Sequence, residues 1–100
     1  MRPFRLSPEA RRDVQEVWAY IARDSMEAAA RVRREIRDAC RRLAHHPYSG
    51  HSRGDLTTRE DVLFWPVYSY LIIYRPDRKP LEILRVLHLH GNRDVTRILG

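Results

Sequence analysis

The sequence has very little of what disulfide-bonded, secreted or membrane-spanning proteins need. Cys40 is the only cysteine, so no disulfide can form within the chain, and a reducing compartment is expected. No apolar run approaches the roughly 20 residues that cross a bilayer, and no hydrophobic signal region follows residues 1–5. We therefore predict a cytoplasmic protein without direct membrane contact.

Lysine is nearly absent, and arginine takes its place. Lys79 is the only lysine among 19 basic residues, and the net charge is +6 with a pI near 10.2. Residues 1–46 carry 11 arginines against 7 acids, and residues 47–100 carry 8 basic residues against 6 acids, so the charge is spread rather than gathered in a tail. Such a balance predicts an acidic partner, and nucleic acid, an acidic protein and a ribosome all qualify.

The motifs of common catalytic and cofactor sites are also missing. His88 and His90 would share a face of a strand, but no third ligand stands at a suitable spacing, so we predict no metal. No serine lies in a Gly-x-Ser-x-Gly context. The Gly50-x-x-x-Gly54 spacing lacks the Lys-Ser or Lys-Thr of a phosphate loop. No cofactor is expected.

One hundred residues suit a single domain, residues 1–100, that begins with a short strand at residues 4–6. Ser7, Pro8 and Glu9 have the order of a helix start, and the apolar spacing that follows predicts about four turns with Trp18 packed between helix and sheet. Asp24 and Glu27 have the form of a capping box, so a second helix should run from there to about His45. The two helices are expected to form an antiparallel hairpin.

Three strands should follow as an antiparallel meander. Residues 62–65 read as the first strand and residues 66–69 as a turn. Residues 70–75 and 81–88 are apolar runs joined by a loop with a proline at each end, which predicts a hairpin. Residues 95–99 allow one closing helical turn. The sequence therefore predicts an α+β domain with its helices on one sheet face.

Two surface features have two interpretations each. The second helix carries an arginine-rich outer face, which is either a solvated, salt-bridged surface or a phosphate- or partner-binding surface. Its members are Arg31, Arg34, Arg37, Arg41 and Arg42. Tyr68, Tyr70 and Tyr74 lie at even spacing, which fits either core and rim packing or the aromatic platform of an RNA reader.

A metal-free ribonuclease needs a base, cations for the developing phosphorane charge, and an acid for the leaving oxygen. Side chains near the edge of the predicted sheet could supply some of these, although an acidic protein partner would use the same kinds of group. The candidates are Arg53, Arg59, Arg75, Arg85, His88, His90 and Arg93.

Several motifs, taken in order, resemble the ParE branch of the RelE/ParE toxin superfamily, and they span nearly the whole chain. They are Leu6-Ser7-Pro8-Glu9-Ala10 with Asp13, Val17-Trp18-x-Tyr20-Ile21, Ala28-Ala29, Leu43-x-x-x-Pro47-x-x-Gly50, Phe64-Trp65-Pro66-Val67, Tyr70-Leu71-Ile72-Ile73-Tyr74-Arg75 and His90-Gly91-x-Arg93-Asp94.

The resemblance implies the toxin of a type II toxin–antitoxin operon, of the plasmid-stabilisation kind, in a hetero-oligomer with an acidic ParD-like antitoxin. Operon DNA would be contacted through the antitoxin. The implied activity is inhibition of DNA gyrase by binding. The alternatives are a RelE-type endoribonuclease that cuts messenger RNA on the ribosome, and a weak toxin that acts only in the antitoxin complex and in operon autoregulation.

The resemblance also distributes roles among the candidates. Antitoxin contacts are expected at Arg31, Arg34, Arg37, Arg41, Tyr70 and Tyr74. Target contacts are expected at Arg53, Arg59, Arg75, Arg85, His90 and Arg93. A nuclease would use Arg85, His88, His90 and Arg93.

The chain differs from RelE-type nucleases at the positions that matter for cleavage. They resemble one another in a lysine-rich segment after the helices, an arginine in the strand and a C-terminal tyrosine. Here Leu71 stands nearest the strand arginine, no tyrosine follows Tyr74, and only Arg93 can be carried over. These differences favour a non-enzymatic toxin. From the ParE pattern the chain departs at Leu63, where many relatives have arginine, and at Tyr68, where glycine is usual.

Overall fold

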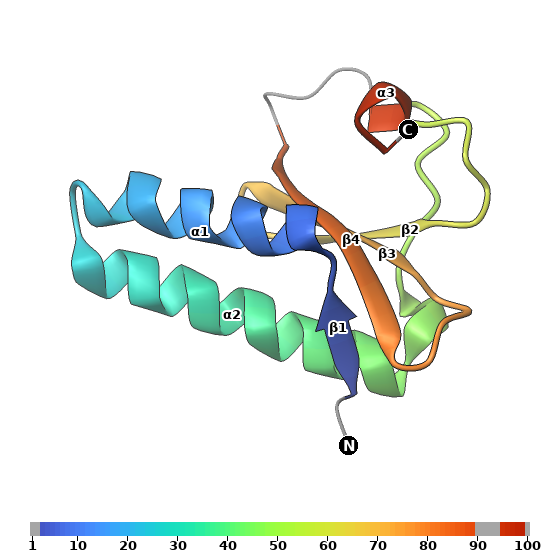
Figure 1. The fold of residues 1–100 in the computed structure, drawn as a ribbon, viewed down its shortest axis with the longest axis horizontal. Helices are drawn as coiled ribbons and strands as arrows, with labels where there is room; N and C mark the ends of the chain where they lie inside the picture. Colours follow the sequence, from blue (N-terminus) through green and yellow to red (C-terminus); the bar gives the residue numbers. More distant parts are fainter. Residues whose placement is uncertain (1–2, 90–94, 100) are drawn as a thin grey trace.

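The computed structural model describes residues 3–89 and 95–99. Two long helices lie side by side against one face of a twisted sheet, and a short helix lies on the other side of that sheet (Figure 1). This arrangement confirms the predicted α+β class. In chain order the elements are β1 (Phe4–Leu6), α1 (Pro8–Ala22), α2 (Met26–His45), the short 3-10 helix η1 (Pro47–Ser49), β2 (Leu63–Val67), β3 (Tyr70–Arg75), β4 (Leu81–His88) and α3 (Val95–Leu99).

Both long helices begin at a serine. The Ser7 hydroxyl accepts a hydrogen bond from the Ala10 N–H at 2.9 Å, as the sequence predicts for a cap followed by proline. The predicted cap of α2 at Asp24 is wrong by one residue, because Ser25 accepts the N–H of Ala28 at 3.0 Å. Asp24 instead continues the last turn of α1, donating its N–H to Ile21 O at 3.0 Å.

The four strands lie in the order β1-β4-β3-β2. The antiparallel meander is confirmed, whereas the parallel pairing of β1 with β4, with Phe4 opposite Leu81, was not foreseen. Pro66 was predicted in a turn but belongs to β2, which is an edge strand, where a proline need not break a ladder bond. The turn is therefore tight, and Tyr68 takes a φ of 53° within it.

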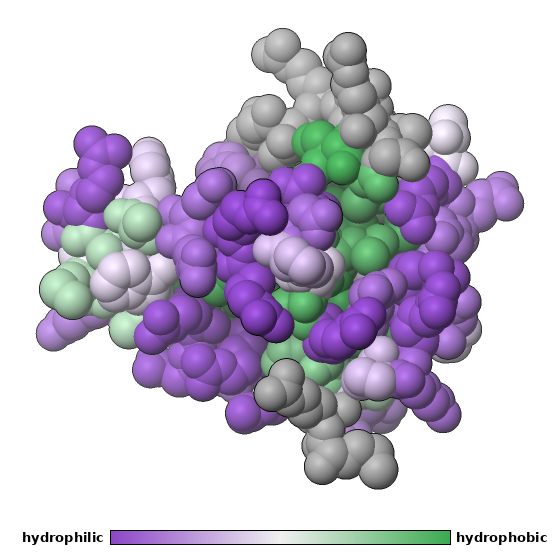
Figure 2. Space-filling model, viewed as in Figure 1, coloured by the Kyte–Doolittle hydropathy of each residue, from purple (hydrophilic) through white to green (hydrophobic). Residues whose placement is uncertain are grey.

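Each face of the sheet has its own apolar core. The face toward the long helices buries Ile36, Cys40, Leu43, Ile72 and Tyr74, among others. The opposite face, which sequence reasoning left bare, buries a second cluster that α3 and the long loop before β2 cover. That cluster comprises Val62, Phe64, Leu71, Ile73, Leu87 and Val95. Figure 2 shows hydrophilic side chains over most of the molecule, with hydrophobic surface beside β4 and α3.

The two tyrosines of β3, Tyr70 and Tyr74, are packed in the core. Tyr74 has no exposed surface, and its hydroxyl donates to Pro47 O at 2.6 Å and accepts the Gly50 N–H at 3.0 Å. Burial raises its pKa. Tyr70 is also buried, so neither ring forms an open platform. Tyr74 therefore fastens the chain leaving α2 to the centre of the sheet.

Trp18 differs from its expected position. Its side chain is half-buried rather than packed into the core under the helices, and the Arg33 guanidinium of α2 lies 5.6 Å from its ring centre. The indole Nε1 is buried and has no hydrogen-bond partner among the described residues. The ring thus joins α1 to α2 through a cation–π contact rather than joining α1 to the sheet.

Candidate functional site: the groove between α1 and β4

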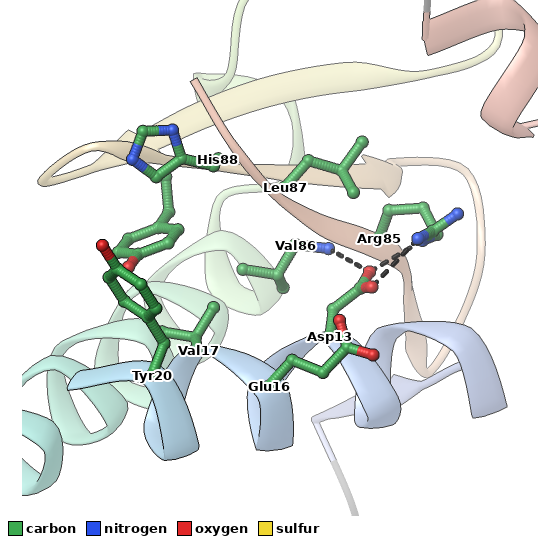
Figure 3. Close-up of a pocket in the computed structure, with 9 residues that line it drawn as sticks. Asp13, Glu16, Val17, Tyr20, Arg85, Val86, Leu87 and His88 are labelled. Atoms are coloured by element: carbon green, nitrogen blue, oxygen red, sulfur yellow. Dashed lines mark hydrogen bonds and ion pairs between the residues drawn. The ribbon is translucent and has the colours of Figure 1, made fainter. Parts of the chain in front are cut away.

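An open groove of about 550 Å³ runs between α1 and β4. Its walls come from three elements, because α1 lies along the helix-facing side of β4 and β3 passes beside it (Figure 3). The lining residues are Asp13, Glu16, Val17, Tyr20, Tyr70, Arg85, Val86, Leu87 and His88. The groove has a charged end at Asp13 and Arg85 and an aromatic end at Tyr20 and His88.

Asp13 and Arg85 form a bidentate ion pair at the charged end. Arg85 donates from Nε to Asp13 Oδ2 at 2.7 Å and from Nη2 to Oδ1 at 2.9 Å. The Val86 N–H also donates to Oδ2 at 2.9 Å, so the carboxylate, which is 8% exposed, is held from three sides. The hydrogen bonds that Arg85 donates to Asp13 raise the pKa of Arg85. Both charges are therefore committed to holding α1 on β4.

The aromatic end is formed by one ring from each of three elements. Tyr70 and His88 meet edge to face, with ring centres 5.3 Å apart, and Tyr20 of α1 is 68% exposed beside them. Burial raises the pKa of the Tyr70 hydroxyl, and the nearby Tyr20 adds to that shift. Val17 and Val86 provide the apolar floor between the two ends. A partner with an apolar or aromatic side chain would fit this end of the groove.

Three of the candidate target-contact residues lie outside the groove, and each is paired with a carboxylate. Arg53 bonds Asp55 at 2.9 Å through two nitrogens, and Arg75 bonds Asp77 at 3.0 Å. Arg59 bonds Asp61 at 2.8 and 2.6 Å, which lowers the pKa of Asp61 to about 2. Each of the three guanidinium groups therefore already has a carboxylate counter-ion within the chain.

Asp61 also links two of these pairs. Arg75 Nε lies 3.6 Å from Asp61 Oδ2, close enough for an ion pair, although this nitrogen makes no hydrogen bond in the described structure. Arg59 and Arg85 further line a small hollow of about 100 Å³ together with Ile98 and Leu99 of α3. The structure thus brings Arg59, Arg75 and Arg85 near one another, while Arg53 lies earlier on the loop that also carries Arg59.

The arginines of α2 are different, because they are exposed and mostly unpaired. The sequence placed Glu27 and Asp38 to pair with arginines four residues later. Within α2 the structure instead has one ion pair, from Asp38 to Arg41 at 3.9 Å. Three other candidate antitoxin contacts, Arg31, Arg34 and Arg37, have no ion pair to a described residue. The arginine-rich face is thus solvated with a single salt bridge within α2, and its use as a partner-binding surface stays a prediction.

Two predicted site residues, His90 and Arg93, lie outside the described residues, so their placement stays a prediction. Residues 3–89 and 95–99 contain no group of three metal-ligating side chains placed to hold an ion. No helix in this part of the chain is long and apolar enough to cross a membrane.

Sequence reasoning missed Asp13 as a functional position, although a signal was present. Asp13 lies on the buried stripe of α1 between Ala10 and Val14. A carboxylate on an apolar helix face requires a buried partner, because an unpaired buried charge is costly. That partner, Arg85, lies too far along the chain for any local pattern to identify it.

Comparison with known proteins places this chain in a family. Residues 4–92 match the family model described as the ParE toxin of the type II toxin–antitoxin system, parDE. The chain belongs to the ParE toxin family. Toxin ParE1 of Caulobacter vibrioides is 34% identical over 92% of this chain and 94% of that protein. The protein Y4kP of Sinorhizobium fredii is 42% identical over 87% of this chain and 88% of its own length.

A solved structure shares the ParE-family fold. It is described as a chromosomal ParDE TA system from P. aeruginosa, and it superposes with a TM-score of 0.71 over 90% of this chain and 98% of that chain. The two sequences are only 17% identical, so this likeness concerns the fold. The strand, the helix pair and the three strands that follow are therefore the family's architecture.

Proposed function

We propose that this ParE-family chain is a toxin that acts by binding its target and not by cutting RNA. The observation that carries the proposal is the Asp13–Arg85 pair. The resemblance assigns a nuclease role to Arg85, His88, His90 and Arg93. Among these four, Arg85 is the arginine that lies within the described residues, and its Nε and Nη2 both donate to the Asp13 carboxylate. A cation neutralised in this way is poorly suited to stabilise the developing charge of a phosphorane. With Leu71 in the strand position expected for a RelE-type arginine, cleavage is the weaker hypothesis.

We propose further that an acidic ParD-like antitoxin holds the toxin inactive in a hetero-oligomer. The exposed, mostly unpaired arginines of α2 and the net charge of +6 support an acidic partner, since charge complementarity speeds and orients association. The proposed antitoxin contacts remain Arg31, Arg34, Arg37, Arg41 and Tyr70, which lines the groove. Tyr74 leaves that set because it is fully buried. In this proposal the antitoxin, and not the toxin, contacts the operon DNA.

DNA gyrase is the proposed target, and the cytoplasm is where the two would meet. The proposed target contacts are Arg53, Arg59 and Arg75. Because each is paired with a carboxylate of this chain, binding must replace that carboxylate or share it with the target. Purified toxin is expected to reduce supercoiling by purified gyrase, and prior addition of the antitoxin should prevent the effect. Unchanged supercoiling at a toxin concentration that arrests growth would remove gyrase as the target.

The nuclease alternative makes the opposite prediction. A RelE-type enzyme would shorten a translated reporter messenger RNA within minutes of toxin induction, whereas a binding toxin would leave it intact. Induction that neither arrests growth nor cuts the reporter would indicate a weak toxin that acts only with its antitoxin. The cleaved reporter is the one result that would overturn the binding mechanism.

A further inference from the structure

The groove between α1 and β4 is negatively charged, although the chain as a whole is strongly basic. Its lining contains the carboxylates of Asp13 and Glu16 against the guanidinium of Arg85, while the net charge of the chain is +6 with histidine neutral. The hydrogen bonds to Asp13 raise the pKa of Arg85, and the charges of Asp13, Glu9 and Glu16 add to that rise. A groove lined by an excess of one sign of charge concentrates ligands of the opposite sign. This groove therefore favours a cationic ligand.

Glu16 is the carboxylate that such a ligand can use. Asp13 is already held by three donors, two from Arg85 and one from the Val86 N–H. Glu16 lies three residues later on α1 and is exposed, and its side chain makes no ion pair or hydrogen bond to any residue in the described part of the chain. Figure 3 shows its carboxylate at the same end of the groove as the Asp13–Arg85 pair. A cation that enters this end can pair with Glu16 without displacing Arg85.

Tyr20 supplies an aromatic ring one turn further along α1. Residues four apart lie on the same face of a helix, so Glu16 and Tyr20 are neighbours on the wall of the groove. The Tyr20 ring is 68% exposed, and Figure 3 shows it near His88. A carboxylate beside an exposed ring suits a guanidinium or ammonium group, which gains a charge-assisted hydrogen bond and a cation–π contact together. An arginine or lysine side chain meets both requirements.

Like charge disfavours two acidic classes of ligand here. The phosphates of a nucleic acid and a run of carboxylates in an acidic antitoxin would both face Asp13 and Glu16. The antitoxin contact proposed at Tyr70 lies at the aromatic end, where an apolar side chain is enough. An enzyme that acts on DNA, by contrast, presents arginines and lysines on the surfaces with which it holds phosphates. A basic segment of the protein target is therefore the occupant that fits.

We propose that the groove between α1 and β4 is the target-recognition site of the toxin and binds a basic segment of the protein that it inhibits. An arginine or lysine of that segment pairs with Glu16 and lies against the Tyr20 ring. An adjacent apolar side chain of the segment covers the floor at Val17 and Val86. The inference rests on the proposed function, and it adds an acidic and aromatic contact to the arginines proposed above.

Matched charge reversals test the pairing with Glu16. Glu16→Lys reverses the free carboxylate of the groove, and Glu35→Lys makes the same change at an exposed position of α2 that does not line the groove. The toxin level that gives half-maximal growth arrest, after induction without antitoxin, should rise about tenfold or more for Glu16→Lys and about threefold or less for Glu35→Lys. Glu16→Gln, which only removes the charge, should fall between them. The affinity of Glu16→Lys for the antitoxin should not decrease, which checks that the variant is folded.

A second set of variants tests the ring. Tyr20→Ala removes the ring from the groove, and Tyr48→Ala removes a ring that is 72% exposed outside it. Because a cation–π contact needs the ring and not the hydroxyl, Tyr20→Ala should raise the half-maximal toxin level about fivefold or more, whereas Tyr20→Phe and Tyr48→Ala should stay within about twofold of the unaltered chain. Circular dichroism of each purified variant checks that α1 is intact.

The same variants, assayed with purified gyrase, separate this inference from the proposed target. Loss of growth arrest in Glu16→Lys supports the groove, and if the unaltered toxin leaves supercoiling unchanged, gyrase alone is overturned. Growth arrest by Glu16→Lys and Tyr20→Ala at the same level as by Glu35→Lys and Tyr48→Ala overturns the groove as the recognition site. Stronger arrest by Glu16→Lys overturns a basic occupant. An unaltered chain that arrests growth at no level overturns both proposals.

Discussion

Arg85 of β4 donates two hydrogen bonds to Asp13 of α1 across 72 residues of sequence. The same carboxylate accepts the Val86 N–H, so α1 is fixed both to a side chain and to the backbone of a central strand. This contact fixes where α1 lies along the sheet. The groove described above takes its shape from that position, because its two walls are the joined elements.

Replacing Asp13 tests how much this contact stabilises the fold. Asp13→Asn keeps an acceptor for Val86 but leaves Arg85 without a counter-charge in a poorly exposed site, so we expect the free energy of unfolding to fall by about 2–3 kcal/mol. Glu82→Gln removes the Arg5–Glu82 pair, whose arginine is 61% exposed, and should cost about 0–1 kcal/mol. Urea denaturation of both variants measures the difference. Equal costs would show that Asp13 is no more than a surface partner.

Gly50 is required by a neighbouring side chain and not by its backbone conformation. Its φ of −72° suits any residue, but a Cβ would overlap the Tyr74 hydroxyl that binds the Gly50 N–H. Gly50→Ala should therefore cost about 1–3 kcal/mol by displacing Tyr74. Gly54→Ala is the matched control, since a Cβ there meets nothing within 4 Å. Thermal unfolding of the two variants should show a lower midpoint for Gly50→Ala alone.

Tyr68 is a strained position that glycine should relieve. Its φ of 53° lies in the left-handed region, where a residue with a Cβ is disfavoured, and its ring is 60% exposed. Tyr68→Gly should stabilise the chain by about 0.5–1 kcal/mol despite losing an aromatic ring. Tyr48→Gly, at another exposed tyrosine, with a φ of −96°, should destabilise it. A loss of stability in Tyr68→Gly would mean that the ring makes contacts worth more than the strain.

Cys40 should be chemically inert while the chain is folded. Burial raises the pKa of its thiol to about 12 from an ordinary value near 9, so almost no thiolate exists at pH 8. Reaction with a thiol-specific reagent should be at least about 100-fold slower in the native chain than in urea. A native rate close to the unfolded one would show that the core between α2 and the sheet opens readily.

The raised pKa of Cys40 also gives a direction for the pH dependence of stability. The folded chain keeps the proton of the Cys40 thiol to higher pH than the unfolded chain does. The contribution of this thiol to the free energy of unfolding is therefore complete below about pH 9. It is lost as the pH rises from about 9 toward about 12. Between pH 8 and 10, Cys40→Ala should lose less stability than the unaltered chain. If the free energies of unfolding of the two proteins fall in parallel with pH, the raised pKa of Cys40 is contradicted.

Local patterns were enough to predict most of the elements. Ser7 and Pro8 start α1, Pro47 follows the end of α2, and the prolines at 76 and 80 flank the β3–β4 loop, because each acts on the backbone within a few residues. The errors arose where a local signal depends on distant structure. Pro66 indicates a turn in isolation, but at a sheet edge it fits a strand, and edge position is a property of the whole fold.

The candidate site was harder to predict for the same reason. Arginine abundance singled out Arg53, Arg59 and Arg75, yet short-range carboxylates neutralise them, and the groove depends on Asp13, which was not a candidate. Pairs such as Arg59 and Asp61, two residues apart, could have been anticipated from the sequence. The partnership of Asp13 with Arg85 could not, since it exists only once α1 has docked on β4.

The parallel pairing of β1 with β4 has a consequence for the order in which the molecule can be completed. Phe4 is opposite Leu81, so the earliest strand to leave the ribosome has no partner until most of the polypeptide has been synthesised. Closing so long a loop makes the final sheet dependent on distant contacts and slows its formation. During synthesis the sheet of the toxin therefore stays incomplete, with β1 unpaired, until translation of the messenger RNA is nearly over.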